Sequence, residues 1–138
     1  MVTIQTRYQG ELRTQATHGP SKTVLVTDAP VDNQGKGESF SPTDLVATAL
    51  ATCMLTTMGI VAKRHGWALE GATATVEKHM VADPERRIGM LTVHIQVPGN
   101  FGEKERTILE RTAFTCPVHK SLSPKVEIPV TFQWGEAS

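Results

Sequence analysis

Alternating polar and apolar residues at the start of the chain predict β-strands. Segments 2–9 and 11–17 are typical of two strands on either side of Gly10, and segment 22–27 of a third. Turn-forming residues separate these segments. The pattern therefore predicts an antiparallel meander over about residues 2–27.

The middle of the chain carries the strongest helix pattern. A central helix is expected over about residues 42–65, because residues 45–62 are largely apolar or small. Ser41 can cap the start of this helix, and Asp44 three residues later completes an approximate capping box. Gly66 is expected to end the helix.

The central helix is long enough to be weighed as a membrane span. Its eighteen residues from 45 to 62 contain no charge, which reaches the lower limit for crossing a bilayer. Four threonines and several small residues make the segment only moderately apolar. A helix that is apolar on most sides is also typical of a buried core helix, so we expect burial inside the protein and no membrane partner.

The second half of the chain predicts strands, a helix and a last strand. Strands are expected over about residues 72–97, an amphipathic helix over 102–115 and a strand over 126–134. Pro129 places that last strand at an edge or a bulge. Together the elements predict an α+β fold, with residues 1–138 as one domain.

The composition of the chain limits which partners and which location are expected. Fourteen basic and fourteen acidic residues give no net charge, and neither sign forms a run, so no nucleic-acid partner is expected. Residues 1–8 lack a basic segment followed by an apolar one. The sequence therefore predicts no signal peptide and a cytoplasmic location.

The chain contains two cysteines, Cys53 in the central helix and Cys116 directly before Pro117. In a reducing compartment, paired cysteines indicate catalysis, redox sensing or metal binding more often than a permanent disulfide. They could also be buried thiols that pack as small hydrophobic groups. A zinc site is a further alternative, because Cys116 and His119 form a C-x-x-H pair. Its other ligands would be Cys53 and one of His18, His65 and His94.

Three segments resemble the OsmC/Ohr family, the osmotically inducible and organic hydroperoxide resistance proteins. They are SPTDLVATALATC (41–53), PERRI (84–88) and CPVHKSLSPKVEI (116–128). The resemblance implies a curved antiparallel sheet around a long buried central helix. It also implies an intertwined homodimer with active sites at the subunit interface. The activity it implies is thiol-dependent reduction of organic hydroperoxides, a form of oxidative-stress defence.

Peroxide cleavage needs a thiolate, and a buried thiol ionises only with a cation nearby. Arg13 is the candidate cation, near where the family places its catalytic arginine, and Arg7 is the competitor. Cys53 would attack the peroxide and become a sulfenic acid, which Cys116 would resolve to a disulfide. The resemblance implies a lipoylated protein or a small external dithiol as the reductant. This cycle needs no metal and no bound organic cofactor.

The chain departs from the family at one position. Better-known peroxidases of the family carry a glutamate ten residues before the first cysteine, where it pairs with the arginine, and this chain has Thr43 there. Asp44 is adjacent, and Glu38 could substitute if its loop folds back. His119 could tune the thiol of Cys116.

Apolar residues around the helix start and around Cys53 could line a substrate pocket. The candidates are Phe40, Met54, Leu55 and Met58, although methionines at helical spacing are also typical of plain core. The rival function is a non-catalytic module that holds a small hydrophobic ligand at the dimer interface, with thiols that only sense oxidation. The replaced glutamate favours this rival, and the two cysteines favour catalysis.

Overall fold

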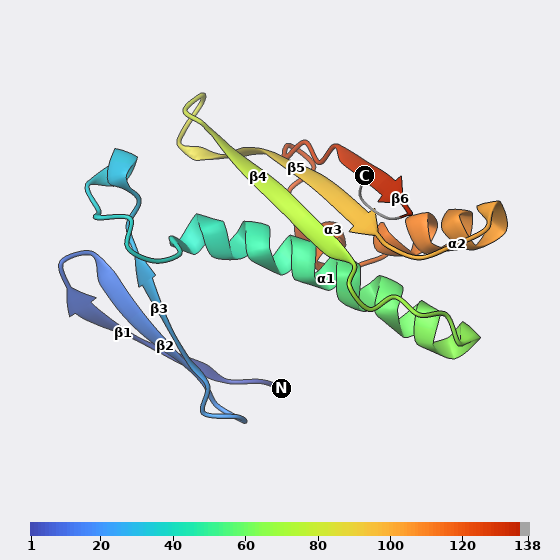
Figure 1. The fold of residues 1–138 in the computed structure, drawn as a ribbon. Coiled ribbons are helices and arrows are strands. Elements are labelled where there is room, and N and C mark those ends of the chain that lie inside the picture. Colours follow the sequence, from blue (N-terminus) through green and yellow to red (C-terminus); the bar gives the residue numbers. More distant parts are fainter. Residues whose placement is uncertain (136–138) are drawn as a thin grey trace. The chain divides into compact units, whose positions relative to one another are not determined.

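Two three-stranded sheets and one long helix dominate residues 1–135, the part of the chain that the computed structural model describes (Figure 1). The chain divides into two compact units, Met1–Val46 and the residues from Ala47 onward. Mixed helices and strands confirm the predicted α+β class. In chain order the elements are β1 (Ile4–Gly10), β2 (Arg13–His18), β3 (Val24–Asp28), a 3-10 turn η1 (Val31–Asn33), α1 (Pro42–His65), β4 (Thr73–Val81), β5 (Arg87–Val97), α2 (Glu103–Ala113), α3 (Pro117–Ser121) and β6 (Val130–Trp134).

The first unit is built on an antiparallel sheet in the order β1-β2-β3, in the region where the sequence predicts a meander. Glu11 and Leu12 connect β1 to β2 with positive φ angles of 53° and 63°. Two positive φ angles in a two-residue connection match the twist of the strands that it joins.

The first unit buries few side chains. Almost every residue of β1 is exposed, and Val24 and Leu25 of β3 are 47% and 44% exposed. The buried side chains of residues 1–46 are Thr27, Asp28 and Ser41, and all three are polar. This sheet therefore has no apolar core of its own among the described residues.

The helix α1 begins and ends as the sequence predicts. The backbone N–H of Ser41 donates to Asp44 Oδ2 at 2.9 Å, and the backbone N–H of Asp44 donates to Ser41 Oγ at 3.0 Å. These reciprocal bonds form a capping box. Gly66 follows the last turn with a φ of 71°, a conformation that costs glycine little.

One side of α1 is buried at a helical spacing. By length and composition alone α1 could cross a membrane, a test that the core helix of a soluble protein also passes. Its buried residues recur every three or four positions, which marks one stripe along the helix. They are Ala47, Leu50, Ala51, Met54, Met58 and Ala62.

The second unit contains a mixed sheet in the order β4-β5-β6. Strands β4 and β5 pair antiparallel, but β6 pairs parallel to β5, with Val93 opposite Val130 and Ile95 opposite Phe132. The sheet is therefore not wholly antiparallel as expected. A parallel pair needs a crossover connection, which α2 and α3 supply. Pro129 directly precedes β6, which is an edge strand as the proline indicates.

The core of the second unit lies between its helices and one face of its sheet. Alternate residues of β5 are fully buried, and they belong to the same cluster as most of the buried stripe of α1 and two residues of α2. The β5 residues are Leu91, Val93, Ile95 and Val97, and those of α2 are Leu109 and Ala113.

Candidate functional site

Cys53 lies midway along α1 and is only partly buried. It packs against the edge of the core cluster instead of sitting within the buried stripe. The hydroxyl of Thr57, one turn later, donates to the carbonyl oxygen of Cys53 at 2.8 Å. The helix therefore presents the Cys53 thiol at a boundary between the core and the surface of the chain.

Cys116 is fully buried and precedes α3 as its N-cap residue. The backbone N–H of His119 donates to Cys116 Sγ at 3.2 Å. The sequence predicts only a short turn after Cys116, but Pro117 at the first helical position and the capping thiol produce one short helix. The sulfur thus has a structural contact in addition to any chemical role.

Both cysteines are free, and Cys53 packs against the buried cluster that contains Cys116. Burial raises the pKa of the Cys116 thiol, the N–H of His119 opposes that effect, and the neighbouring Cys53 thiol raises this pKa further. A rise in pKa keeps Cys116 protonated at neutral pH. A protonated thiol close to a second thiol can donate its proton when the two sulfurs condense through a sulfenic acid.

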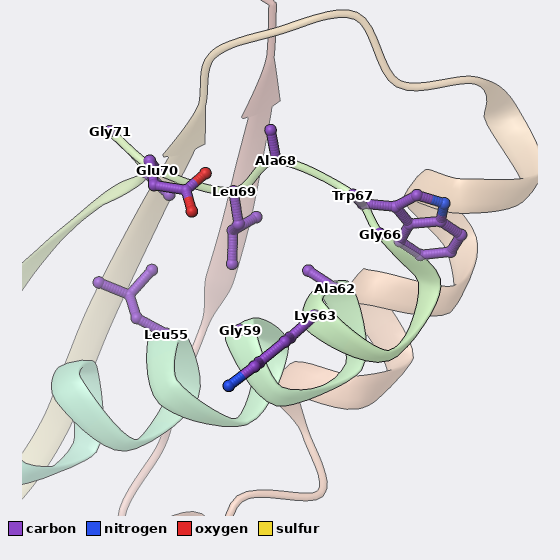
Figure 2. Close-up of a pocket in the computed structure, with 11 residues that line it drawn as sticks. Leu55, Gly59, Ala62, Lys63, Gly66, Trp67, Ala68, Leu69, Glu70 and Gly71 are labelled. Carbon is purple, nitrogen blue, oxygen red and sulfur yellow. The ribbon is translucent and has the colours of Figure 1, made fainter.

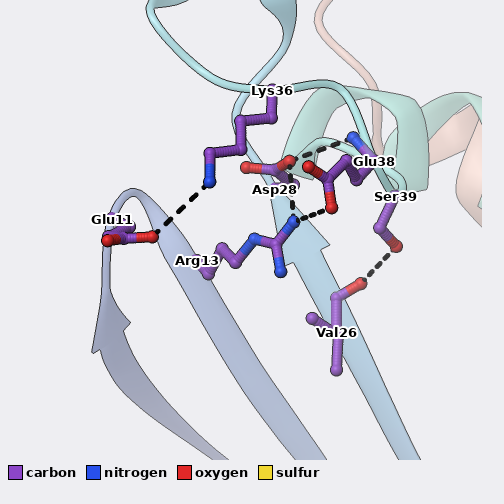
Figure 3. Close-up of polar contacts among 7 residues, drawn as sticks. All are labelled: Glu11, Arg13, Val26, Asp28, Lys36, Glu38 and Ser39. Atoms are coloured by element: carbon purple, nitrogen blue, oxygen red, sulfur yellow. Dashed lines mark hydrogen bonds and ion pairs between the residues drawn. The ribbon is translucent and has the colours of Figure 1, made fainter.

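Arg13 makes two carboxylate contacts within the first unit (Figure 3). Its Nη2 donates to Glu38 Oε2 at 2.6 Å and lies 3.6 Å from Asp28 Oδ2. The hydrogen bond that Arg13 donates to Glu38 is the main reason why the pKa of Arg13 is raised. The loop that carries Glu38 does fold back to the arginine, which is the condition under which Glu38 could replace the family's glutamate.

Asp28 was not among the residues that the sequence singled out. Its side chain is 1% exposed, and its Oδ2 accepts the backbone N–H of Glu38 at 3.0 Å. That hydrogen bond is the first cause of the lowered pKa of Asp28, and the charge of Arg13 contributes. Asp28 is also the cross-strand partner of Arg13 in the β2–β3 register, a relation that requires the sheet to be known.

The other polar candidates have different surroundings. Asp44 is occupied by the capping box with Ser41, and the hydroxyls of Thr43 and Ser41 share a hydrogen bond at 3.2 Å. Arg7 lies in a shallow polar hollow on the β1–β2 sheet, beside Gln15 and Thr17. Of the two candidate arginines, Arg13 is therefore the one that the fold gives carboxylate partners.

The predicted pocket residues are dispersed. Met54 and Met58 are completely buried in the core, as plain core methionines would be, whereas Phe40 is 52% exposed. Leu55 does line a groove of about 820 Å³ between the second half of α1 and the segment that follows it (Figure 2). In that view Leu69 points toward α1 across the groove.

The ligands of the alternative zinc site do not come together. Within residues 1–135, no group of three or more histidine, cysteine, aspartate or glutamate side chains could hold a metal ion. The ring of His119 packs edge-on against Phe114, with centroids 5.7 Å apart. Its backbone, and not its imidazole, is the part that contacts Cys116.

Comparison with known families places most of the chain in one of them. The model of the family described as OsmC-like protein matches residues 35–131, which is more than half of the chain. This match spans α1, both cysteines and most of the second sheet. A comparison with curated proteins finds no match.

Solved structures share the fold over nearly the full length. A Psychrobacter arcticus 273-4 protein, provisionally assigned to osmotic stress induction and the detoxification response, is 48% identical with a TM-score of 0.91, and 96% of each chain is covered. An organic hydroperoxide resistance protein OsmC from Legionella pneumophila is 19% identical with a TM-score of 0.77, again over 96% of each chain. One from Elizabethkingia anophelis is 16% identical with a TM-score of 0.75 and the same coverage. These likenesses confirm the OsmC-like fold.

Proposed function

Because this chain belongs to the OsmC family, we propose that it is a thiol-dependent peroxidase that reduces organic hydroperoxides through Cys53 and Cys116. The observation that carries the proposal is that both thiols are free and that Cys53 packs against the buried cluster that contains Cys116. Relatives of the same fold that are named for organic hydroperoxide resistance support the substrate class.

The proposed reaction uses the two sulfurs one after the other. The Cys53 thiolate attacks one oxygen of the hydroperoxide, the O–O bond breaks, and the other oxygen takes a proton and leaves as an alcohol. Cys53 is then a sulfenic acid. The Cys116 thiol condenses with it, which forms a disulfide and releases water. An external dithiol, which we propose to be a small thiol compound or a lipoylated protein, reduces the disulfide and is itself oxidised.

The unequal burial of the two cysteines favours this division of roles. Cys53 is partly exposed, so a peroxide can approach it, whereas Cys116 is fully buried and held by the N–H of His119. A peroxidatic thiol must be accessible to substrate. A resolving thiol needs only to be close to the first sulfur.

Arg13 is proposed as the cation of the reaction. A guanidinium can stabilise a thiolate and orient a peroxide through its several N–H donors. Glu38 takes the place of the glutamate that Thr43 replaces, since it is the carboxylate hydrogen-bonded to Arg13 at 2.6 Å. The orienting partner is thus supplied by the loop before α1.

We further propose a cytoplasmic homodimer. The first sheet exposes apolar residues that monomeric proteins usually cover, including Ile4, Tyr8 and Leu25. The family resemblance implies that two chains intertwine. A second copy of this chain would cover such a face.

The test is a thiol titration of the reduced protein before and after one equivalent of cumene hydroperoxide, a model organic hydroperoxide. The wild type should lose two thiols rapidly. Cys53→Ser should not react, and Cys116→Ser should stop at a sulfenic acid that a sulfenic-acid-selective probe traps. Persistence of both wild-type thiols for hours would overturn the peroxidase proposal.

A binding module remains the second candidate, and the groove along α1 is the observation that favours it. Leu55, Ala62 and Leu69 provide apolar lining, and Lys63 and Glu70 lie at its border. This candidate would be supported if a fluorescent fatty-acid analogue binds the protein while the protein's thiols do not react with the hydroperoxide. Absence of binding together with rapid thiol loss would reject it.

A further inference from the structure

The carboxylate of Asp28 is buried at the end of β3 and faces the arginine that we assign to the reaction. We propose that Asp28 is a positioning residue, which holds the Arg13 guanidinium directly and also holds the loop that brings Glu38 to it. This inference rests on the proposed function for its catalytic consequence, but the positioning itself is a property of the first unit.

The direct contact is a cross-strand ion pair. Arg13 and Asp28 are opposite each other in the β2–β3 register, and Arg13 Nη2 lies 3.6 Å from Asp28 Oδ2. Opposite charges at directly paired positions stabilise an antiparallel sheet. Because Asp28 is 1% exposed while Glu38 is 58% exposed, water competes far less for the Asp28 carboxylate than for that of Glu38.

The indirect contact passes through the backbone of the loop. Asp28 Oδ2 accepts the N–H of Glu38 at 3.0 Å, and the backbone N–H of Asp28 donates to the carbonyl of Phe40 at 3.0 Å. Ser39, between these two residues, donates from its hydroxyl to the carbonyl of Val26 at 2.8 Å (Figure 3). Three consecutive loop residues are therefore tied to β3, and Asp28 makes two of the three ties.

The far side of the loop is also tightly folded. A Cβ on Gly35 would lie 1.8 Å from the carbonyl oxygen of Ala29, so no other residue fits there without a backbone shift. The N–H of Gly37 donates to that same carbonyl at 3.2 Å. The loop is thus built to one conformation, and that conformation delivers Glu38 to Arg13.

The consequence is that the buried Asp28 carboxylate controls both contacts of Arg13, namely its own ion pair and the position of Glu38. Loss of Glu38 would remove one contact of Arg13 and leave the other. Loss of the Asp28 charge would remove the direct ion pair, and loss of its whole side chain would release the loop as well. Asp28 should therefore matter more for the orientation of Arg13 than the closer Glu38 does.

The experiment combines kinetics with side-chain NMR. In a Cys116→Ser background, the rate constant for oxidation of Cys53 by cumene hydroperoxide is measured for Asp28→Asn, Glu38→Gln and Arg13→Gln. Asp28→Asn should lower it about tenfold or more, because small displacements of a positioned group cost rate steeply. The same substitution added to Arg13→Gln should cause no further loss, since residues that act through one another are not additive.

NMR measures how firmly the Arg13 guanidinium is held, and it does so without any reaction taking place. Rotation of the Arg13 guanidinium about its Nε–Cζ bond should be slow in the wild type, faster in Glu38→Gln and in Asp28→Asn, and fastest in Asp28→Ala, which loses both the ion pair and the tie to the loop. Glu11→Gln is the matched control, because Glu11 pairs with Lys36 at 3.7 Å on the exposed surface of the same unit. It should leave both the rate constant and the rotation unchanged.

The outcomes separate the two proposals. If the wild type does not react but Asp28→Asn frees the guanidinium, the positioning holds and the peroxidase assignment falls. If Asp28→Asn leaves the rotation slow, or lowers the rate equally with and without Arg13, the positioning is overturned. Should Asp28→Asn fail to fold, Gly35→Ala replaces it as a change that displaces the loop while retaining the Asp28 carboxylate. Gly35→Ala should then speed rotation to the level of Glu38→Gln and no further, and rotation faster than in Glu38→Gln would overturn the proposal.

Discussion

The two units of the chain are stabilised by opposite means. The buried side chains of residues 47–135 are all apolar or thiol groups, and all of them except Ala51 form one cluster. Those of residues 1–46 are all polar: Thr27, Asp28 and Ser41. The second unit therefore relies on the hydrophobic effect, whereas the described contacts of the first are hydrogen bonds and ion pairs around Asp28 and a capping box at Ser41.

Because of this difference, each group of the proposed reaction lies in surroundings that suit its charge. The proposed resolving thiol lies in the apolar core, where burial raises the pKa of Cys116. The guanidinium and its carboxylates lie in the polar unit, where burial does not neutralise them. Holding Arg13 in its charged form within an apolar unit would cost more free energy.

The largest expected effect is in the apolar unit. Leu50→Ala removes a fully buried side chain from α1, and should lower the free energy of unfolding by about 2–5 kcal/mol. Val24→Ala, on the exposed β3, should change it by about 0.5 kcal/mol or less. Urea unfolding of both variants measures the contrast, and equal losses would abolish the distinction between the units.

The next effect concerns the exposed face of the polar unit. If a second copy covers this face, Leu25→Asp would bury an unpaired charge, and should raise the dissociation constant of the homodimer at least about tenfold, or about 1.4 kcal/mol. Analytical ultracentrifugation measures it, with Gln15→Glu on the other face of the sheet as the control. A wild type that is monomeric at all concentrations, or a Leu25→Asp variant that associates normally, would contradict the prediction.

The loss of stability at high pH should depend on Cys116, which lies in the apolar second unit. The folded-state pKa of Cys116 is raised above its ordinary value of 9.0, so the folded state holds its proton more tightly than the unfolded state does. The stabilisation is complete below about pH 9 and is lost as the pH rises from there through the folded-state pKa. Thermal unfolding from pH 8 to 11 should show this loss in the wild type and less of it in Cys116→Ser.

The loss of stability at low pH should depend on Asp28, which lies in the polar first unit, and this effect should be smaller. The pKa of Asp28 is lowered from its ordinary value of 3.8, so Asp28 stabilises the fold above about pH 4. That contribution is lost as the pH falls through the lower folded-state pKa. The midpoint of thermal unfolding should therefore fall less between pH 5 and pH 2 in Asp28→Asn than in the wild type. Equal slopes would show that the Asp28 charge contributes nothing.

Features encoded by neighbouring residues could be predicted from the sequence. The capping box of Ser41 and Asp44 and the stop at Gly66 define α1 because each depends on residues within one turn. The pairing of Cys53 with Cys116 stays a prediction, suggested by the two cysteines and by the resemblance to a family, since no local rule brings residues so distant in sequence together.

Features that depend on register could not be predicted. Asp28 is one polar residue among many until β2 and β3 are aligned and place it opposite Arg13. The parallel direction of β6 likewise follows from its crossover through α2 and α3, which is a property of the whole unit. Glu38 was identified only under the condition that its loop folds back, and the loop meets that condition through its ties to β3.

The capping role of Cys116 makes folding and chemistry separable by a single mutation. Serine is among the preferred N-cap residues, so a change of Cys116 to serine keeps an acceptor for the His119 N–H. Such a change would pass any selection that acts on folding or abundance while it removes the proposed resolving thiol. Relatives that carry serine at this position would therefore be expected to fold well and to have moved to another chemistry.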